Sequence, residues 1–423
     1  MKILYLSTSD IIGGGARGAY RLHRGFLSNG VDSKLIVNNK YSDDYTVIGP
    51  KNKFQAAVNR VRPYIAGVLL KLQSDQNTII HSVNILPSKL VNYINNSDAD
   101  LVMLHWIGAE MISIEEIGKI KKKIVWRLAD QWAFCGAEHY ILPSQDPRYI
   151  EGYSRSNRPK EHKGIDIDQW TWKRKVKHWS QKQITIVTGS KWLAECAEAS
   201  YLFSNQRIEV IPSGLDITVY KPLDKNFARK ALNLPLDKKI ILFGSISATS
   251  DTRKGFHLLL PALQNLTKYL KFDKVATVIF GASEPREVPD FKFPYYYLSS
   301  LYDDWSLVLA YSAADVFVLP SMQDNLPYTL LESMSCGTPC VGFNTGGISD
   351  IIEHKINGYL AKAFDPIDFS NGIQFILENQ DIKNEMAKKC RQKAIEEYDV
   401  NVQVKRYLKL FDTLNISHDQ DGF

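Results

Sequence analysis

Short apolar runs alternate with helical patterns along the whole of this 423-residue chain. Runs of this kind are typical of strands buried on both faces of a parallel sheet. Strands that alternate with helices build βαβ units, so the pattern predicts an α/β chain with doubly wound parallel sheets. The expected strands are 2–7, 34–39, 101–106, 123–128, 184–190, 239–244, 276–281, 315–320 and 339–343, and the clearest helices are 16–30, 257–270, 328–337 and 400–414.

The length of the chain implies two domains, because a single hydrophobic core stops growing at about 250–300 residues. The segment 211–223 contains two prolines, a glycine and no clear period, which marks it as the linker. We therefore expect one Rossmann-like domain over 1–212 and a second over 213–399. The remaining part, 400–423, is expected to form a helix that packs back on the first domain, followed by a loose tail. In open sheets of this type ligands bind at the carboxyl ends of the strands.

Cysteine spacing and hydropathy limit the setting of the protein. Its five cysteines are far apart, so neither a disulfide framework nor a zinc site is expected, and a cytoplasmic location fits best. The most apolar stretch, 64–70, is far shorter than the roughly 18–20 residues that span a bilayer. We expect it to be a buried helix segment, with docking on a membrane surface as the alternative.

Positive charge is concentrated in the first half of the chain. Residues 1–200 hold 28 Lys and Arg against 19 Asp and Glu, while the remainder is slightly acidic. The excess clusters at 119–123 and 173–179. Solvated helix faces are the expected explanation, and attraction to anionic lipid is the functional alternative. Nucleic-acid binding is disfavoured, because no recognition motif accompanies the charge.

A glycine-rich loop, GGGAR at 13–17, joins the first strand to the first helix. Gly14 and Gly15 would let the backbone approach a phosphate at the helix N-terminus, although a purely structural turn is the alternative. The loop also fits G-x-G-x-x-G. A dinucleotide site would require an acidic residue about 20 positions further on, and this chain has Asn38–Lys40 there, which argues against an NAD-dependent oxidoreductase.

Two carboxylates stand eight positions apart in the segment 319–343. If Asp324 ends a loop and Glu332 lies on the following helix, both can accept hydrogen bonds from sugar hydroxyls in one cleft. Alone, the pair would more simply be a helix cap and a solvated side chain.

The residues around this pair resemble the E-x7-E motif of the retaining glycosyltransferase family 4, which has the GT-B fold. The matching elements are PS before the pair, LP inside it, and CGTP with a VGF strand after it. The stretch 344–360 resembles the glycine-rich turn and following loop of that family. The similarity extends from the GGGAR loop to about residue 400.

The resemblance implies a nucleoside-diphosphate-sugar donor held by the C-terminal domain. Glu332 would bind the ribose hydroxyls and Asp324 the transferred sugar, with the amides of Asn325 and Leu326 near the sugar or diphosphate. The first acid of the motif is usually Glu. Asp324 is one methylene shorter, which leaves the identity of the sugar open.

A lysine at the start of a helix can neutralise a departing diphosphate, and a cation of this kind supplies a large catalytic term. Lys254, just before Gly255, matches the second member of a basic pair in the family. The first member would stand at Ser245, and we expect Arg253 to take its place.

The segment 125–140 resembles the H-D segment on the acceptor side of the family. Asp130 matches the aspartate, whereas Ala129 replaces the histidine. Asp130 would orient donor or acceptor, with a structural cap as the alternative. His105, at a strand end, would reach the cleft or be a satisfied polar group.

The resemblance therefore implies a retaining glycosyltransferase that uses front-side displacement, with the departing phosphate oxygen deprotonating the acceptor. We expect no cofactor and no metal. The expected partners are a nucleoside diphosphate sugar, a glycan or lipid-linked glycan in cell-surface polysaccharide assembly, and an anionic membrane contacted peripherally at the inner face of the plasma membrane. The alternatives are a sugar-nucleotide epimerase of the same fold and a non-catalytic nucleotide-sugar-binding protein.

Overall fold

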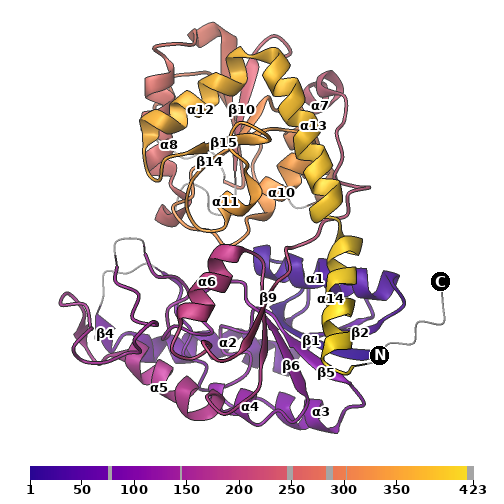
Figure 1. The fold of residues 1–423 in the computed structure, drawn as a ribbon, viewed down its shortest axis with the longest axis vertical. Coiled ribbons are helices and arrows are strands. Elements are labelled where there is room, and N and C mark those ends of the chain that lie inside the picture. The colour runs from indigo at the N-terminus through magenta and orange to yellow at the C-terminus, as the bar shows by residue number, and fades with distance from the viewer. Residues whose placement is uncertain (75–78, 143–144, 245–250, 283–288, 302, 417–423) are drawn as a thin grey trace. The chain divides into compact units, whose positions relative to one another are not determined.

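The structure, a computed structural model, describes residues 1–74, 79–142, 145–244, 251–282, 289–301 and 303–416. The chain divides into two compact units, one formed by Met1–Pro212 with Gln403–Phe423 and the other by Ser213–Val402. Each unit is built around its own parallel sheet, which helices cover (Figure 1).

The first unit contains a seven-stranded sheet in the order β3-β2-β1-β5-β6-β8-β9, with every neighbouring pair parallel. Its strands are β1 (Lys2–Ser9), β2 (Asp32–Asn39), β3 (Val47–Ile48), β5 (Leu101–Leu104), β6 (Lys123–Arg127), β8 (Thr185–Thr188) and β9 (Arg207–Val210). A separate antiparallel pair joins β4 (Gln73–Ser74) to β7 (Lys163–Gly164). The helices are α1 (Gly14–Ser28), α2 (Lys53–Leu70), α3 (Leu90–Asn96), α4 (Ile114–Gly118), α5 (Ile167–Trp179), α6 (Lys191–Ala199) and α14 (Val400–Thr413).

The apolar runs of this sheet feed two cores, because successive residues of a strand point to opposite faces. Ile3 and Tyr5 of β1 pack with α1 and with the C-terminal helix α14. Leu4 and Leu6 pack on the other face with α4, α5 and α6. Burial on both faces explains why these strands are apolar throughout.

The second unit contains a six-stranded parallel sheet in the order β12-β11-β10-β13-β14-β15. Its strands are β10 (Lys239–Gly244), β11 (Val275–Phe280), β12 (Tyr295–Tyr297), β13 (Val316–Leu319), β14 (Cys340–Phe343) and β15 (Gly358–Ala361). Its helices are α7 (Lys225–Ala231), α8 (Phe256–Leu266), α9 (Asp304–Ala313), α10 (Tyr328–Ser335), α11 (Ile348–Ile351), α12 (Pro366–Glu378) and α13 (Gln380–Glu397), with 3-10 turns at Thr252–Lys254 and Phe272–Lys274. In β10, Ile240 and Leu242 face α9 and α10, whereas Ile241 and Phe243 face α8 and α12.

The predicted fold class is confirmed. All nine expected strands are present, and none differs from its expected bounds by more than two residues at either end. The tail expected to be loose lies from residue 417 onward, outside the described residues.

The expectation that 64–70 is buried is wrong. This stretch is the end of α2, in which Ala66 is buried while Ile65 and Val68 are 52% and 61% exposed. The face of α2 that meets the rest of the unit is instead partly polar, because Asn59 and Arg62 donate hydrogen bonds to main-chain carbonyls there. Among the described helices, none is long and apolar enough to cross a bilayer.

The basic clusters are only partly solvated. Lys175 of the 173–179 cluster is fully buried, and its ammonium group donates to main-chain carbonyls within 132–136. Burial lowers the pKa of Lys175 to about 7. Lys122 and Lys123 also donate to main-chain carbonyls. A charge run does not reveal such partners, because the carbonyls come from distant segments.

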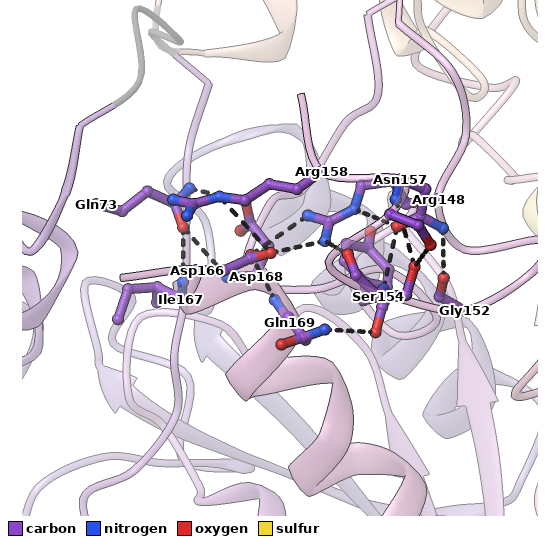
Figure 2. A network of polar contacts seen from close by, with 12 residues as sticks. Gln73, Arg148, Gly152, Ser154, Asn157, Arg158, Asp166, Ile167, Asp168 and Gln169 are labelled. Carbon is purple, nitrogen blue, oxygen red and sulfur yellow. Dashed lines mark hydrogen bonds and ion pairs between the residues drawn. The ribbon is translucent and has the colours of Figure 1, made fainter. Parts of the chain in front are cut away.

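The start of α5 anchors the long connection that precedes it (Figure 2). The Arg148 guanidinium donates to both carboxylate oxygens of Asp166, at 2.7 and 3.3 Å, and that carboxylate also caps the helix at the amide of Gln169. Gln73 bonds the next acid, Asp168, at 2.8 Å. The Arg148–Asp166 ion pair and the Gln73 side-chain amide thus hold the segments around residues 148 and 73 against the start of α5.

Candidate functional site

The basic turn before α8 lies directly against the loop that follows β13. Gly255 has a φ of +71°, and a Cβ atom placed on it would lie only 1.8 Å from the carbonyl oxygen of Pro320. The amide of Met322 also donates to the carbonyl of Arg253 at 2.8 Å. A side chain at position 255 would therefore push this turn away from the loop.

This close approach brings both cations to Asp324. The Lys254 ammonium lies 3.1 and 3.0 Å from the two carboxylate oxygens. Arg253 donates to one of them at 3.2 Å and to the carbonyl of Gln323 at 2.9 Å. Burial alone would raise the pKa of Asp324, but the two cations lower it below its ordinary value, so the carboxylate is ionised at neutral pH.

The charges in this cluster balance. Arg253 also pairs with Asp251, at 3.0 Å, so two cations face two carboxylates. An arriving anion would therefore share Lys254 with Asp324 or draw it away. A lysine that can exchange one oxygen partner for another is suited to hold an anionic group.

A second loop, after β14, fixes the backbone of Asp324. A Cβ atom on Gly346, whose φ is +55°, would lie 2.4 Å from the carbonyl oxygen of Asp324. The amide of Gly347 donates to that oxygen at 2.9 Å, and Thr345 donates to the carbonyl of Met322 at 2.9 Å. The carboxyl ends of β13 and β14 therefore converge at Asp324, where open α/β sheets bind ligands.

Glu332 occupies the interior of the same unit. It lies on α10 at 3% exposure and accepts a hydrogen bond from the Tyr311 hydroxyl at 3.0 Å. Asn325 and Leu326 are buried in the loop beside Asp324. The structure thus brings Arg253, Lys254 and Asp324 into contact, whereas Glu332 bonds to α9. The predicted roles of Glu332, Asn325 and Leu326 stay predictions.

In the first unit, the GGGAR loop meets the ends of two strands. Gly14 is the first residue of α1, after Gly13 with a φ of +93°. A Cβ atom on Gly15 would lie 3.4 Å from the Cβ of Trp106 and 3.8 Å from that of Ala129. The loop therefore lies at the carboxyl ends of β5 and β6, and its binding role stays a prediction.

Asp130 is the centre of a buried chain of polar groups at that edge. One of its oxygens accepts from the Trp106 indole at 2.8 Å and lies 2.7 Å from Nδ1 of His139. Nε2 of His139 lies 2.8 Å from the Ser82 hydroxyl. Burial would raise the pKa of Asp130, but His139 and these donors lower it. Trp106 and His139 thus hold the carboxylate directly, and Ser82 supports it through His139.

His105 is directed into the sheet. It is 5% exposed, and its Nδ1 lies 2.9 Å from the hydroxyl of Tyr5. Burial, together with the nearby Arg127, keeps its pKa well below the ordinary value, so the ring is neutral at physiological pH. This is the satisfied polar group named as the alternative, and a binding role for His105 stays a prediction.

The sequence reasoning missed Trp106, Asp251 and Ser82. Trp106 could have been found, because it follows His105 at a strand end. Asp251 could have been found as the cap of the turn that carries Arg253. Ser82 lies in an irregular segment and gives no signal.

Ser245, where the family has its first basic residue, lies outside the described residues. Within the part of the chain that is described, no group of three or more His, Cys, Asp or Glu side chains could hold a metal ion.

Comparison with known families identifies the second unit. Residues 224–397 match the family described as glycosyl transferases group 1. The chain is 36% identical over 98 residues to an N,N'-diacetylbacillosaminyl-diphospho-undecaprenol alpha-1,3-N-acetylgalactosaminyltransferase of Campylobacter jejuni, which covers 23% of this chain and 26% of that one. It is 27% identical over 215 residues to a UDP-Gal:alpha-D-GlcNAc-diphosphoundecaprenol alpha-1,3-galactosyltransferase of Escherichia coli, which covers 49% and 53%. The chain thus spans only about a quarter to a half of the length of these two relatives.

Solved structures match over nearly the whole chain. A sucrose-phosphate synthase from Thermosynechococcus elongatus superposes with a TM-score of 0.67 at 15% identity, covering 98% of this chain and 99% of that one. Anabaena HepE, in complex with UDP-glucose, gives 0.64 at 15% identity, with 98% and 100% covered. At this identity the likeness shows the fold alone. The chain therefore carries a domain of the glycosyl transferases group 1 family over residues 224–397, and it has the GT-B fold.

Proposed function

We propose that this protein transfers a sugar from a nucleoside-diphosphate donor to a hydroxyl of a glycan or lipid-linked glycan, with retention of anomeric configuration. The observation that carries the proposal is the contact of Lys254 and Arg253 with the buried carboxylate of Asp324. This contact lies at the carboxyl end of β13, inside the domain that matches the transferase family.

Each charged group has a proposed part. Lys254, assisted by Arg253, neutralises the diphosphate as it departs. Asp324 accepts hydrogen bonds from the transferred sugar, and Glu332 from the ribose. In the first unit, Asp130 orients a substrate hydroxyl, and the amides of the Gly14–Gly15 turn approach the phosphates. His105 supports this edge from inside the sheet, through its contact with Tyr5.

In the proposed reaction the bond between the anomeric carbon and the phosphate oxygen breaks. The acceptor oxygen forms its new bond on the same face of the sugar, and its proton passes to the departing phosphate oxygen. The protein contributes positioning and charge stabilisation. Lys254 and Arg253 then neutralise the diphosphate charge that a divalent metal ion neutralises in other transferases. Addition of EDTA is therefore expected to leave the rate unchanged.

The acceptor is proposed from the named relatives. Both transferases described above carry a diphospho-undecaprenol acceptor in their names. A polyprenyl-diphosphate-linked glycan is therefore the first acceptor to test. Its use would place the protein in cell-surface polysaccharide assembly at the cytoplasmic face of the membrane.

The experiment is a mass-spectrometric screen of nucleotide sugars against lipid-linked and free glycan acceptors. Lys254→Ala is expected to lower kcat/KM about 10²–10³-fold, as loss of one charge-stabilising group does elsewhere. Lys268→Ala is the matched control, because Lys268 is an exposed lysine of the same unit. Proton NMR of the product identifies the anomer.

Three results would contradict the proposal. A new nucleotide sugar formed without acceptor would identify an epimerase. Donor binding with no turnover on any acceptor would identify a binding protein. An inverted product would exclude the retaining mechanism.

A further inference from the structure

Helix α2 carries a stripe of apolar side chains that face solvent. The residues recur at intervals of four and three positions, which places them along one side of a helix. Each of them is at least 40% exposed, and Phe54 reaches 79%. The stripe consists of Phe54, Val58, Val61, Ile65, Val68 and Leu72, the last of which lies just beyond the helix end.

The other side of α2 holds the helix on the first unit. Asn59 donates to the carbonyl of Asn38 at 3.1 Å. The Arg62 guanidinium donates to three main-chain carbonyls, at 2.7 to 2.9 Å, and Ala66 is buried. These contacts fix the rotation of the helix about its axis. The apolar stripe is therefore turned away from the unit, opposite to the usual arrangement of a surface helix.

Every charged residue in the segment around the stripe is basic. Between Asp44 and Asp75 there is no acidic residue. The same stretch holds five cations, Lys51, Lys53, Arg60, Arg62 and Lys71. All of them except Arg62 are exposed. An exposed apolar stripe flanked by cations has the features of a helix that lies in the interface of an anionic bilayer.

We propose that α2 docks this protein on an anionic lipid surface. The stripe enters the boundary between head groups and acyl chains, while Lys53, Arg60 and Lys71 contact lipid phosphates. A second copy of the chain is a poorer occupant, because a symmetric pair of α2 helices would bring like charges together with no acidic partner. The inference stands independently of the proposed transfer reaction.

This assignment differs from the alternative named for the basic clusters, which was attraction to anionic lipid. In the clusters 119–123 and 173–179, Lys175 is buried and Lys122 and Lys123 donate to carbonyls. Neither cluster has an exposed apolar stripe of its own. Charge and exposed apolar surface coincide on α2.

The test is co-sedimentation of the full chain with vesicles. Vesicles of phosphatidylcholine alone are compared with vesicles in which a third of the lipid is phosphatidylglycerol. We expect binding to the anionic vesicles and much weaker binding to the neutral ones. Replacing Lys53, Arg60 and Lys71 together by Gln should lower the partition coefficient about a hundredfold, at roughly fivefold for each cation. Replacing Val61, Ile65 and Val68 by Ser should lower it at least about tenfold.

Two matched controls separate α2 from general surface properties. The first control replaces three exposed lysines outside α2 by Gln, namely Lys119, Lys121 and Lys177. The second replaces two exposed phenylalanines of the second unit, Phe227 and Phe272, by Ser. Neither control should change vesicle binding. Circular dichroism and thermal unfolding should match the parent in every variant, because all these side chains are exposed.

Three outcomes would overturn the inference. The first is absence of binding to anionic vesicles. The second is a loss of binding that is as large in the controls as in the α2 variants. The third is a parent protein that is a dimer by light scattering and does not bind vesicles, together with a variant at Val61, Ile65 and Val68 that is a monomer. That result would assign the stripe to a second copy of the chain.

Discussion

Gly255 is the residue that permits the contact between Lys254 and Asp324. Its positive φ and its closeness to the Pro320 carbonyl leave no room for a side chain. We predict that Gly255→Ala lowers the free energy of unfolding by about 2–4 kcal/mol, through strain and the displaced turn. Gly67→Ala is the control, because a Cβ on Gly67 meets nothing within 4 Å, and it should raise stability by about 0.5–1 kcal/mol. Urea unfolding measures both. Equal stability of the Gly255→Ala variant and the parent would contradict the geometry.

His23 gives the first unit a pH-dependent stability. Its ring nitrogens lie 2.8 Å from the hydroxyls of Ser33 and Thr46. Burial is the main cause that lowers the pKa of His23 to about 4, with Arg24 also lowering it and Asp44 opposing. The unfolded chain therefore binds a proton more readily below about pH 6.5, and stability is lost as the pH falls through that range.

This shift predicts a loss of about 2 kcal/mol between pH 7 and pH 5 from His23. Urea unfolding at the two pH values measures it. His23→Gln, which cannot titrate, should reduce the difference between the two pH values by about that amount. A variant with the same pH dependence as the parent would show that His23 is not responsible.

At single residues, the sequence predicts chemistry better than burial. Lys254 and Asp324 were expected in one site, and the structure brings them into contact. Glu332 was expected to bind the donor, and His105 to reach the cleft or be a satisfied polar group; both are buried beside tyrosines, and their binding roles stay predictions. A motif fixes the type of residue and its element. It does not fix which way the side chain points, because packing partners come from elsewhere in the chain.

At the scale of elements, position in the sheet separates the strands that could be predicted from those that could not. The nine inner strands of the two large sheets were predicted, whereas their four edge strands, β3, β9, β12 and β15, were not. Such edge strands lack a long apolar run, because they are covered less completely than central strands. Helix α2 shows the same limit. Its residues 64–70 were expected to be buried, and only the polar anchors Asn59 and Arg62 reveal the opposite orientation.

The network before α5 makes a further prediction for an element. Arg148 is buried and pairs with Asp166, whose side chain is only 12% exposed (Figure 2). Arg148→Ala leaves that carboxylate without its closest cation, which costs about 3–5 kcal/mol of unfolding free energy. Arg155→Ala, an exposed arginine of the same connection, should change stability by less than about 0.5 kcal/mol. Chemical denaturation compares the two. Similar effects would mean that the pair does not anchor α5.

At the scale of the whole molecule, each unit has its own cores, and the chain returns to the first unit at its end. Phe411 of α14 is fully buried and lies with its ring 6.0 Å from that of Phe26. Phe411→Ala should therefore destabilise the first unit by about 3–5 kcal/mol. Seven of the eight tryptophans belong to that unit, so tryptophan fluorescence reports on its unfolding.

Lys405→Ala is the control for this prediction, since Lys405 is an exposed residue of the same helix. It should leave the fluorescence transition unchanged. An unshifted transition in Phe411→Ala would show that α14 adds no stability to the first unit.

The central claim is that Lys254 holds the diphosphate of a nucleotide donor. Calorimetric titration of the full chain with UDP, GDP and ADP tests it most directly, because binding needs neither acceptor nor turnover. With the nucleotide that binds most tightly, Lys254→Met should weaken affinity at least about tenfold, the loss of a charged hydrogen bond, while Lys268→Met should bind as the parent does. Equal affinity of Lys254→Met and the parent, with both folded, would contradict the account.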